Sequence, residues 1–250
     1  MPESLAPNTT DDIDAVLAAT ASASPEQFIA WAAQRYGDGL AMTSSFGAQS
    51  AVMLHLATQV VPHIPVVWID TGFNFPETYQ FADALTRRLD LNLKVYQSPM
   101  SPGRMVALHG PLWEQGVEGL DTYDRIRKVE PRDRAFSELS VTAWLAGLRH
   151  GQTRFRGTLR KAERFGEVVK LHPILDWPAQ QVHDYLKTHD LPLHPLVEKG
   201  YTSIGDWHST RAVTGDLDDR SGRFLGLKQE CGLHVPTTEA ENESRDASGL

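Results

Sequence analysis

The one cysteine of the 250-residue chain, Cys231, is the residue best suited to covalent chemistry. A single thiol cannot form a disulfide within the chain, and it cannot supply the several sulfur ligands of a structural zinc site or an iron–sulfur cluster. Cys231 lies between Gly226 and Gly232, with no run of apolar residues around it. A lone cysteine is most often a buried, inert residue, whereas a reactive thiolate needs exposure. We therefore favour an exposed nucleophile at Cys231, with the inert thiol as the alternative.

Two polar turns could hold an anionic or nucleotide ligand. Residues 44–50 (Ser-Ser-Phe-Gly-Ala-Gln-Ser) stand between a predicted strand and a predicted helix. Such a turn presents backbone N–H groups, hydroxyls and a helix N-terminus to one point, which suits an anion. An ordinary Ser/Gly turn is the equally weighted alternative, because neither the Walker pattern nor the Rossmann glycine pattern is present. Asp70, Thr71 and Gly72 follow the next strand, where the carboxylate either accepts from ribose or adenine donors or caps the following helix.

A third polar turn carries cations. Arg149, Gln152 and Arg156 follow another predicted strand, and guanidinium groups there could clamp a phosphate or sulfate with paired hydrogen bonds. Because ligands of open α/β sheets bind beyond the carboxyl ends of the strands, the three turns together predict an anion or nucleotide site.

Charge and composition limit the ligand and the partners. The formal net charge of −8 argues against non-specific nucleic-acid binding, while basic residues gather at 125–134 and 149–164. Such local clusters suit a small polyanion, although solvated surface charge is the usual role of a single arginine. No apolar run is long enough to span a membrane, and residues 1–10 do not resemble a secretory signal, so we expect a cytoplasmic protein. The ten histidines show no His-Glu-x-x-His motif, and we expect no metal site.

The elements that must position these residues alternate between strand and helix. Two helices are expected within residues 11–36, the second capped by Ser24 and begun by Pro25. Further helices are expected at 48–58, 76–89, 131–139 and 178–188, and strands at 40–44, 66–69, 93–96, 142–146 and 168–171. This alternation predicts an α/β fold with a doubly wound, mostly parallel sheet. We expect a helical extension over 1–36, a nucleotide-binding catalytic domain over 37–225 and a mobile C-terminal tail over 226–250.

The chain resembles the assimilatory 3′-phosphoadenylyl sulfate (PAPS) reductases, which are thioredoxin-dependent. The resemblance covers roughly residues 40–235 and implies a Rossmann-like fold of the adenine nucleotide α-hydrolase type. It is carried by the turn at 44–49, by Asp-Thr-Gly at 70–72, and by Leu-Trp-Glu-Gln-Gly at 112–116. It is carried further by residues 128–131, 146–149 and 205–211 and by the specific Glu-Cys-Gly-Leu-His at 230–234.

The resemblance implies a reaction with no bound redox cofactor. The Cys231 thiolate attacks the sulfur of the PAPS sulfonate, adenosine 3′,5′-bisphosphate leaves, and thioredoxin releases sulfite from the S-sulfocysteine. Glutaredoxin is the alternative reductant, and a homodimer is implied. Lys228 and His234 could lower the pKa of the thiol. The substrate-binding residues are expected to be Ser44, Ser45, Phe46, Gly47, Gln49, Asp70, Thr71, Gly72, Lys128, Arg149, Gln152, Arg156, Arg211, Arg223 and His234, with Arg154 as an alternative to Arg156.

Related enzymes that reduce adenylyl sulfate (APS) hold a four-iron cluster through cysteine pairs. The corresponding positions here are Tyr123, Asp124, Asp206 and Ser209, which offer no thiolate, so we expect no cluster and PAPS as substrate. A cluster-free APS reductase remains the first alternative. An ATP-dependent adenylating enzyme of the same fold is another, and it would not need Cys231. A nucleotide-binding regulatory protein without turnover is the third.

Overall fold

The computed structural model describes residues 12–213, 222–224, 230 and 232–234. Predictions about Cys231, Lys228 and most of the tail therefore fall outside the described residues. None of the described helices has the length and apolarity of a membrane-spanning segment.

A six-stranded sheet forms the centre of the fold, in the order β3-β2-β1-β4-β6-β5. The strands are β1 (Leu40–Thr43), β2 (Pro65–Ile69), β3 (Asn92–Tyr96), β4 (Ala143–Leu145), β5 (Ala162–Phe165) and β6 (Val168–Leu171). All neighbours pair in parallel except β5, which runs antiparallel to β6 at the edge. The predicted doubly wound, mostly parallel sheet is confirmed, and each of the five predicted strands is present.

The edge strand β5 was not expected. Its four residues include two charged ones, and only Ala162 is fully buried. The sequence therefore has no apolar run there that would predict a strand. A two-residue turn joins it to β6, and Gly166 in that turn has a φ of +58°, which glycine adopts without strain.

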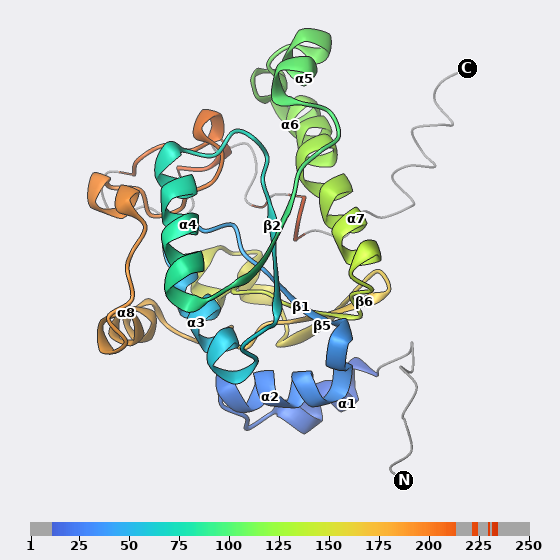
Figure 1. Cartoon of the computed structure of the whole chain (residues 1–250), viewed down its shortest axis with the longest axis vertical. Helices are drawn as coiled ribbons and strands as arrows, with labels where there is room; N and C mark the ends of the chain where they lie inside the picture. Colours follow the sequence, from blue (N-terminus) through green and yellow to red (C-terminus); the bar gives the residue numbers. More distant parts are fainter. Residues whose placement is uncertain (1–11, 214–221, 225–229, 231, 235–250) are drawn as a thin grey trace.

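Both faces of the sheet are buried, as the continuous apolar run in β2 indicates. Val66 and Trp68 pack into one cluster, and Val67 and Ile69 pack into another, because successive strand side chains point to opposite faces. The first cluster lies beneath α2 (Pro25–Tyr36), α3 (Ser50–Val60), α4 (Pro76–Leu89) and α8 (Ala179–Thr188). The second includes residues of α7 (Glu130–Glu138), and Figure 1 shows α5, α6 and α7 on the side of the sheet opposite α3, α4 and α8.

Helix starts follow the local sequence. Helix α2 begins at the predicted N-cap, Ser24, and the structure adds a capping box, in which the Ser24 hydroxyl accepts from the Gln27 N–H and the Gln27 side chain accepts from the Ser24 N–H. Together with α1 (Ile13–Thr20), it lies at the end of the molecule away from α5 (Figure 1). Phe28 and Ile29 of α2 belong to the main apolar cluster, so this helix shares its core with the sheet.

One nearly continuous helical column carries part of the site. Helix α5 (Pro102–His109) and the short turn η2 (Leu112–Glu114) lead into α6 (Gly116–Asp124). A π-helical turn, η3 (Arg125–Val129), then joins α6 to α7, and the Glu130 N–H donates to the Arg125 carbonyl across the wider spacing. Such turns are frequent at functional sites because they change the direction of the side chains they carry. The remaining short turns are η1 (Gly37–Gly39), η4 (His150–Gln152), η5 (Arg156–Thr158), η6 (Pro195–Lys199) and η7 (Trp207–Ser209).

Candidate functional site

A cavity of about 220 Å³ lies beyond the carboxyl ends of β1, β2 and β4. This is where an open α/β sheet is expected to bind its ligand. The predicted site residues that line it are Ser44, Ser45, Gly47, Gln49, Thr71, Lys128, Arg149, Gln152, Arg156, Arg223 and His234. Phe46, Asp70, Gly72 and Arg211 do not line it.

The turn after β1 forms one wall of the cavity. The Ser44 N–H donates to the Val67 carbonyl at 3.1 Å, and the Ser44 hydroxyl accepts from the Phe46 N–H at 3.1 Å. Phe46 adopts a φ of +49° and its ring packs edge-on against Trp68, with centroids 5.0 Å apart. Phe46 is therefore a buried support for the turn, while Ser44, Ser45 and Gly47 present its polar side to the cavity.

Asp70 closes the turn after β2. Its carboxylate accepts hydrogen bonds from the Gly72 N–H, the Asn74 amide, the Tyr79 hydroxyl and the Gln97 amide, at 2.6 to 3.1 Å. Burial, reinforced by the hydrogen bond to Asp70, raises the pKa of Tyr79 to about 12. With its carboxylate bonded to four neighbours, Asp70 organises this turn. It does not cap the following helix, as the alternative from sequence had it, because the N-cap of α4 is Phe75.

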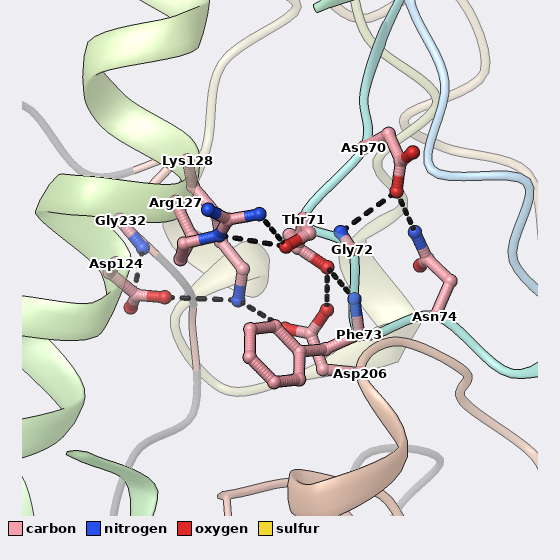
Figure 2. Close-up of polar contacts among 10 residues, drawn as sticks. All are labelled: Asp70, Thr71, Gly72, Phe73, Asn74, Asp124, Arg127, Lys128, Asp206 and Gly232. Atoms are coloured by element: carbon pink, nitrogen blue, oxygen red, sulfur yellow. Dashed lines mark hydrogen bonds and ion pairs between the residues drawn. The ribbon is translucent and has the colours of Figure 1, made fainter. Parts of the chain in front are cut away.

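A chain of charged contacts leads from this turn toward the C-terminal residues (Figure 2). The Thr71 hydroxyl donates to Asp206, and Lys128 Nζ lies 3.0 Å from carboxylate oxygens of both Asp206 and Asp124. The other Asp124 oxygen accepts from the Gly232 N–H at 3.1 Å. Burial disfavours the charged form of Asp206, but Lys128, His208 and the Thr71 hydroxyl together outweigh burial and hold the pKa of Asp206 well below its usual range.

Asp124 and Asp206 belong to this series of contacts, but neither was predicted from the sequence as a binding residue. They stand at positions where related enzymes hold cluster cysteines. The structure brings them together with Tyr123, whose ring lies 5.1 Å from Lys128 Nζ. A lysine and two carboxylates thus occupy this region. The nearby Arg127 holds the same turn by donating to the Thr71 carbonyl (Figure 2). It also donates to the Met100 carbonyl.

The turn after β4 contributes two buried guanidinium groups. Arg149 donates from Nη2 to Gln49 Oε1 at 2.7 Å and from Nη1 to the Trp177 carbonyl at 3.4 Å. Arg156 is also buried and lines the cavity, whereas its alternative, Arg154, is exposed. Gln152 accepts from the Arg149 N–H and from the Arg156 side chain, so it holds the two arginines in one arrangement.

Arg211 and Arg223 have different surroundings. Arg211 is exposed and lies outside the cavity lining. Arg223 is buried in the lining, its guanidinium packs 4.9 Å from the centre of the Phe224 ring, and none of the described carboxylates forms an ion pair with it. The guanidinium also occupies the space beside Gly205 that a Cβ atom would fill. A buried cation of this kind is suited to an anionic ligand.

The described residues near the C-terminus contact the cavity wall. His234 stacks on Trp144 with ring centroids 5.6 Å apart, and its carbonyl accepts from Lys170 at 3.4 Å. Arg132 Nη1 donates to the carbonyls of Gly232 and Leu233, both at 3.2 Å. Lys170 was not predicted as a site residue, because it lies within an ordinary strand pattern. Arg132 was predicted only as a member of the basic cluster at 125–134.

Five cations line the cavity, namely Lys128, Arg132, Arg149, Arg156 and Arg223, and Asp206 is the acidic residue among the lining residues. Three of these cations are paired with carboxylates: Lys128 with Asp124 and Asp206, Arg132 with Asp133, and Arg156 with Glu230. The guanidinium groups of Arg149 and Arg223 can attract an anionic ligand and neutralise it before an anionic nucleophile approaches.

Comparison with known proteins agrees with this geometry. The family described as "Phosphoadenosine phosphosulfate reductase domain" matches residues 39–212. A phosphoadenosine 5′-phosphosulfate reductase from Synechocystis sp. is 57% identical over 231 residues, which are 92% of this chain and 93% of that protein. Its counterpart from Synechococcus sp. is 54% identical over 233 residues, 92% of this chain and 99% of that protein.

Solved structures support the same grouping. The crystal structure of PAPS reductase from Candida auris, a phosphate complex, superposes with a TM-score of 0.70 at 31% identity, covering 80% of this chain and 96% of that one. FMN adenylyltransferase from Candida glabrata, with FAD and inorganic pyrophosphate, gives a TM-score of 0.55 at 16% identity over 96% of this chain and 86% of that one. The second likeness concerns the fold alone, which is of the adenine nucleotide α-hydrolase type.

Proposed function

This chain belongs to the phosphoadenosine phosphosulfate reductase family, and on that premise we propose that it reduces PAPS to sulfite and adenosine 3′,5′-bisphosphate in assimilatory sulfate reduction. One observation carries the proposal for this chain's own residues. Two buried guanidinium groups from separate segments, Arg149 and Arg223, line one cavity at the carboxyl ends of the strands, beside Ser44 and Ser45. PAPS carries phosphate and sulfonate groups, and its binding requires such a concentration of positive charge.

Different turns around the cavity bind different parts of the substrate. The backbone and hydroxyls of Ser44 and Ser45, at the N-terminal side of α3, suit a phosphate oxygen. Arg149 and Arg223 neutralise the negative charge of the leaving nucleotide. Gln49 fixes the direction of the Arg149 guanidinium through its hydrogen bond, so the cation needs little rearrangement when the substrate enters.

The chemical step is a displacement at sulfur. The Cys231 thiolate forms a bond to the sulfonate sulfur, the bond from that sulfur to the bridging phosphate oxygen breaks, and the nucleotide leaves with the electron pair. Cysteine is a natural nucleophile for a covalent intermediate of this kind. The product on the enzyme is an S-sulfocysteine, and no electron has yet been supplied from outside.

An external dithiol completes the turnover. A thiolate of reduced thioredoxin attacks Cys231 sulfur, sulfite leaves with two electrons, and the second thioredoxin thiol resolves the mixed disulfide and restores Cys231. Glutaredoxin is the alternative reductant, and we expect the enzyme to work as a homodimer. The reaction needs no resident redox group, and one cysteine in 250 residues cannot supply the ligands of a four-iron cluster.

Mass spectrometry of the intact protein and of its proteolytic peptides, after mixing with PAPS and, separately, with APS, tests the proposal. We expect a gain of one SO₃ group on the Cys231 peptide with PAPS, and its loss with release of sulfite when reduced thioredoxin is added. Cys231→Ser should gain no mass while still binding adenosine 3′,5′-bisphosphate.

Each other outcome identifies an alternative. A gain with APS alone would indicate a cluster-free APS reductase. Turnover retained by Cys231→Ser would exclude the thiol mechanism and favour an adenylating enzyme. Binding of nucleotide by the unmodified protein without any adduct would indicate a regulatory protein.

A further inference from the structure

The C-terminal residues on both sides of Cys231 are held by buried charged groups. Glu230 precedes Cys231 in the sequence and Gly232 follows it. The Glu230 carboxylate pairs with Arg156, and the Gly232 N–H donates to Asp124 at 3.1 Å. These two anchors come from η5 and from the end of α6, which are far apart in the sequence.

The pair between Glu230 and Arg156 is bidentate and buried. Arg156 Nε and Nη2 each donate to a different Glu230 oxygen at 2.8 Å, and the exposed fractions of the two side chains are 5% and 4%. The Thr153 hydroxyl also donates to Glu230, at 3.1 Å. Arg156 Nη1 donates to Gln152, so all three nitrogens of the Arg156 guanidinium have partners within the protein.

The residues that follow Gly232 continue along the same surface. We use the name docking residues for Asp124, Arg132, Trp144, Arg156 and Lys170, which hold Glu230 and residues 232–234. Leu233 adds apolar contact by packing against the second core cluster. Most of the contacts made by residues 232–234 use backbone groups, whereas Glu230 is held through its charged side chain.

The ligand cavity is present together with the contacts of Glu230 and residues 232–234. Leu233 and His234 are among the lining residues of the cavity, and the space of about 220 Å³ is present while Glu230 is paired with Arg156. The pairing of Glu230 with Arg156 therefore does not fill this space. This favours Glu230 as an anchor over Glu230 as a competitor that a substrate anion must displace.

We propose that Glu230 is a positioning residue for the Cys231 thiol and that Arg156 is its receptor, not a ligand of the substrate as the sequence indicated. The inference rests on the proposed function, because positioning matters only if Cys231 attacks a ligand in the cavity. The carboxylate fixes the residue directly before the nucleophile. The Asp124 contact to Gly232 fixes the residue directly after it.

The test compares Glu230→Gln, Arg156→Gln, the double variant and Glu230→Asp. The double variant leaves no buried charge without a partner, and Glu230→Asp keeps the charge but shortens the reach, so both remain informative if a single variant folds poorly. Three quantities are measured: the affinity for adenosine 3′,5′-bisphosphate, the single-turnover rate of adduct formation with PAPS, and the rate of trypsin cleavage after Lys228. The last reports docking independently of catalysis, because trypsin needs accessible chain on both sides of the bond.

We expect both Gln variants to be cleaved at least fivefold faster and to form adduct at least tenfold more slowly, with nucleotide affinity within twofold of wild type. Glu230→Asp should also slow adduct formation, and the double variant should be no slower than the slower single variant. The exposed pair of Asp14 and Arg160 supplies the controls: Asp14→Asn and Arg160→Gln should leave all three quantities unchanged.

Several results would overturn the inference. A tenfold loss of nucleotide affinity in Arg156→Gln alone would make Arg156 a substrate ligand. Tighter nucleotide binding with an unchanged adduct rate in Glu230→Gln would make Glu230 a competitor, and unchanged trypsin cleavage would exclude the anchor. Absence of any adduct in the wild-type protein would instead refute the proposed function, while the cleavage rates would still test the docking.

Discussion

The guanidinium of Arg149 donates to the side-chain oxygen of Gln49 at 2.7 Å, and this contact joins the turn after β1 to the turn after β4. Both residues line the cavity, and Arg149 is buried. The neutral amide orients the cation without cancelling its charge, which leaves the electrostatic attraction available to an anionic ligand.

Gln49→Glu should therefore weaken nucleotide binding without unfolding the protein. A carboxylate at this position would pair with Arg149 and repel the phosphates of the ligand. We expect at least a tenfold loss of affinity for adenosine 3′,5′-bisphosphate, about 1.4 kcal/mol, measured by titration calorimetry. Gln59→Glu, on the exposed side of α3, is the matched control and should bind as wild type. An affinity within twofold of wild type for Gln49→Glu would mean that Arg149 does not face the ligand.

Gly205→Ala should move one cation of the cavity while leaving the fold in place. A Cβ at this position would lie 2.2 to 2.5 Å from guanidinium atoms of Arg223, so the end of that flexible side chain must shift. We expect about a tenfold loss of nucleotide affinity and a change in melting temperature below about 4 °C. Gly103→Ala, where an added Cβ meets nothing within 4 Å, is the control. Unchanged affinity would place the ligand away from Arg223.

Local sequence signals predicted most of the fold, with strand β5 as an exception. Helix α4 begins and ends where it was expected, because Pro76 suits the first helical position and Asp90, with a φ of +49°, ends the helix. The apolar run of β2 likewise predicted a buried parallel strand. Strand β5 was missed because its pairing with β6 gives it a place in the sheet that its own composition does not indicate.

The candidate site was predictable only in part, because contacts between residues far apart in the sequence determine much of it. Turns that follow strands converge through the topology, so Ser44, Thr71 and Arg149 could be placed together from sequence. The partner of a charged side chain depends on tertiary contacts: Thr71 and Asp206 are separated by 135 residues, and Gly232 and Asp124 by 108. No local pattern distinguishes the exposed Arg211 from the buried Arg223, or assigns Arg156 to Glu230.

Asp206→Asn should destabilise the protein, because Asp206 is one of two buried carboxylates beside Lys128. Removal of one partner from a buried ion pair is strongly unfavourable, and we expect a loss of about 3 kcal/mol in the free energy of unfolding at pH 7. Urea denaturation measures this loss, with the exposed Asp38→Asn as the control. A loss below 1 kcal/mol would mean that Asp124 alone satisfies the lysine.

The depressed pKa of Asp206 sets the pH range of that contribution. An aspartate with a lowered folded-state pKa stabilises the protein above its ordinary pKa, and this stability is lost as the pH falls through the folded-state value. The difference between wild type and Asp206→Asn should therefore be constant from pH 7 to pH 5 and shrink only in stronger acid. A difference that already shrinks between pH 7 and pH 5 would contradict the lowered pKa.

Two neutral histidines should make the protein less stable in mild acid. Burial lowers the pKa of His194 and of His208 to about 4 in each case. His194 Nδ1 accepts from the Leu196 N–H at 3.1 Å, which leaves the proton on Nε2, 3.0 Å from the Thr78 hydroxyl. His208 stacks on Trp113 with ring centroids 4.1 Å apart. Neither environment favours a positive charge on the ring.

The direction of the pH effect follows from proton binding. Between about pH 6.5 and pH 4 the unfolded chain binds protons at these histidines and the folded chain does not, so the free energy of unfolding should fall as the pH falls. Each histidine should contribute about 1.4 kcal/mol per pH unit in that interval. The free energy of unfolding is measured by urea denaturation at pH 6.0 and at pH 5.0. Between these two pH values it should fall by about 1.4 kcal/mol less in His208→Gln than in wild type. The exposed His63→Gln should behave as wild type. An identical pH dependence in His208→Gln and wild type would show that His208 already carries its proton in the folded protein.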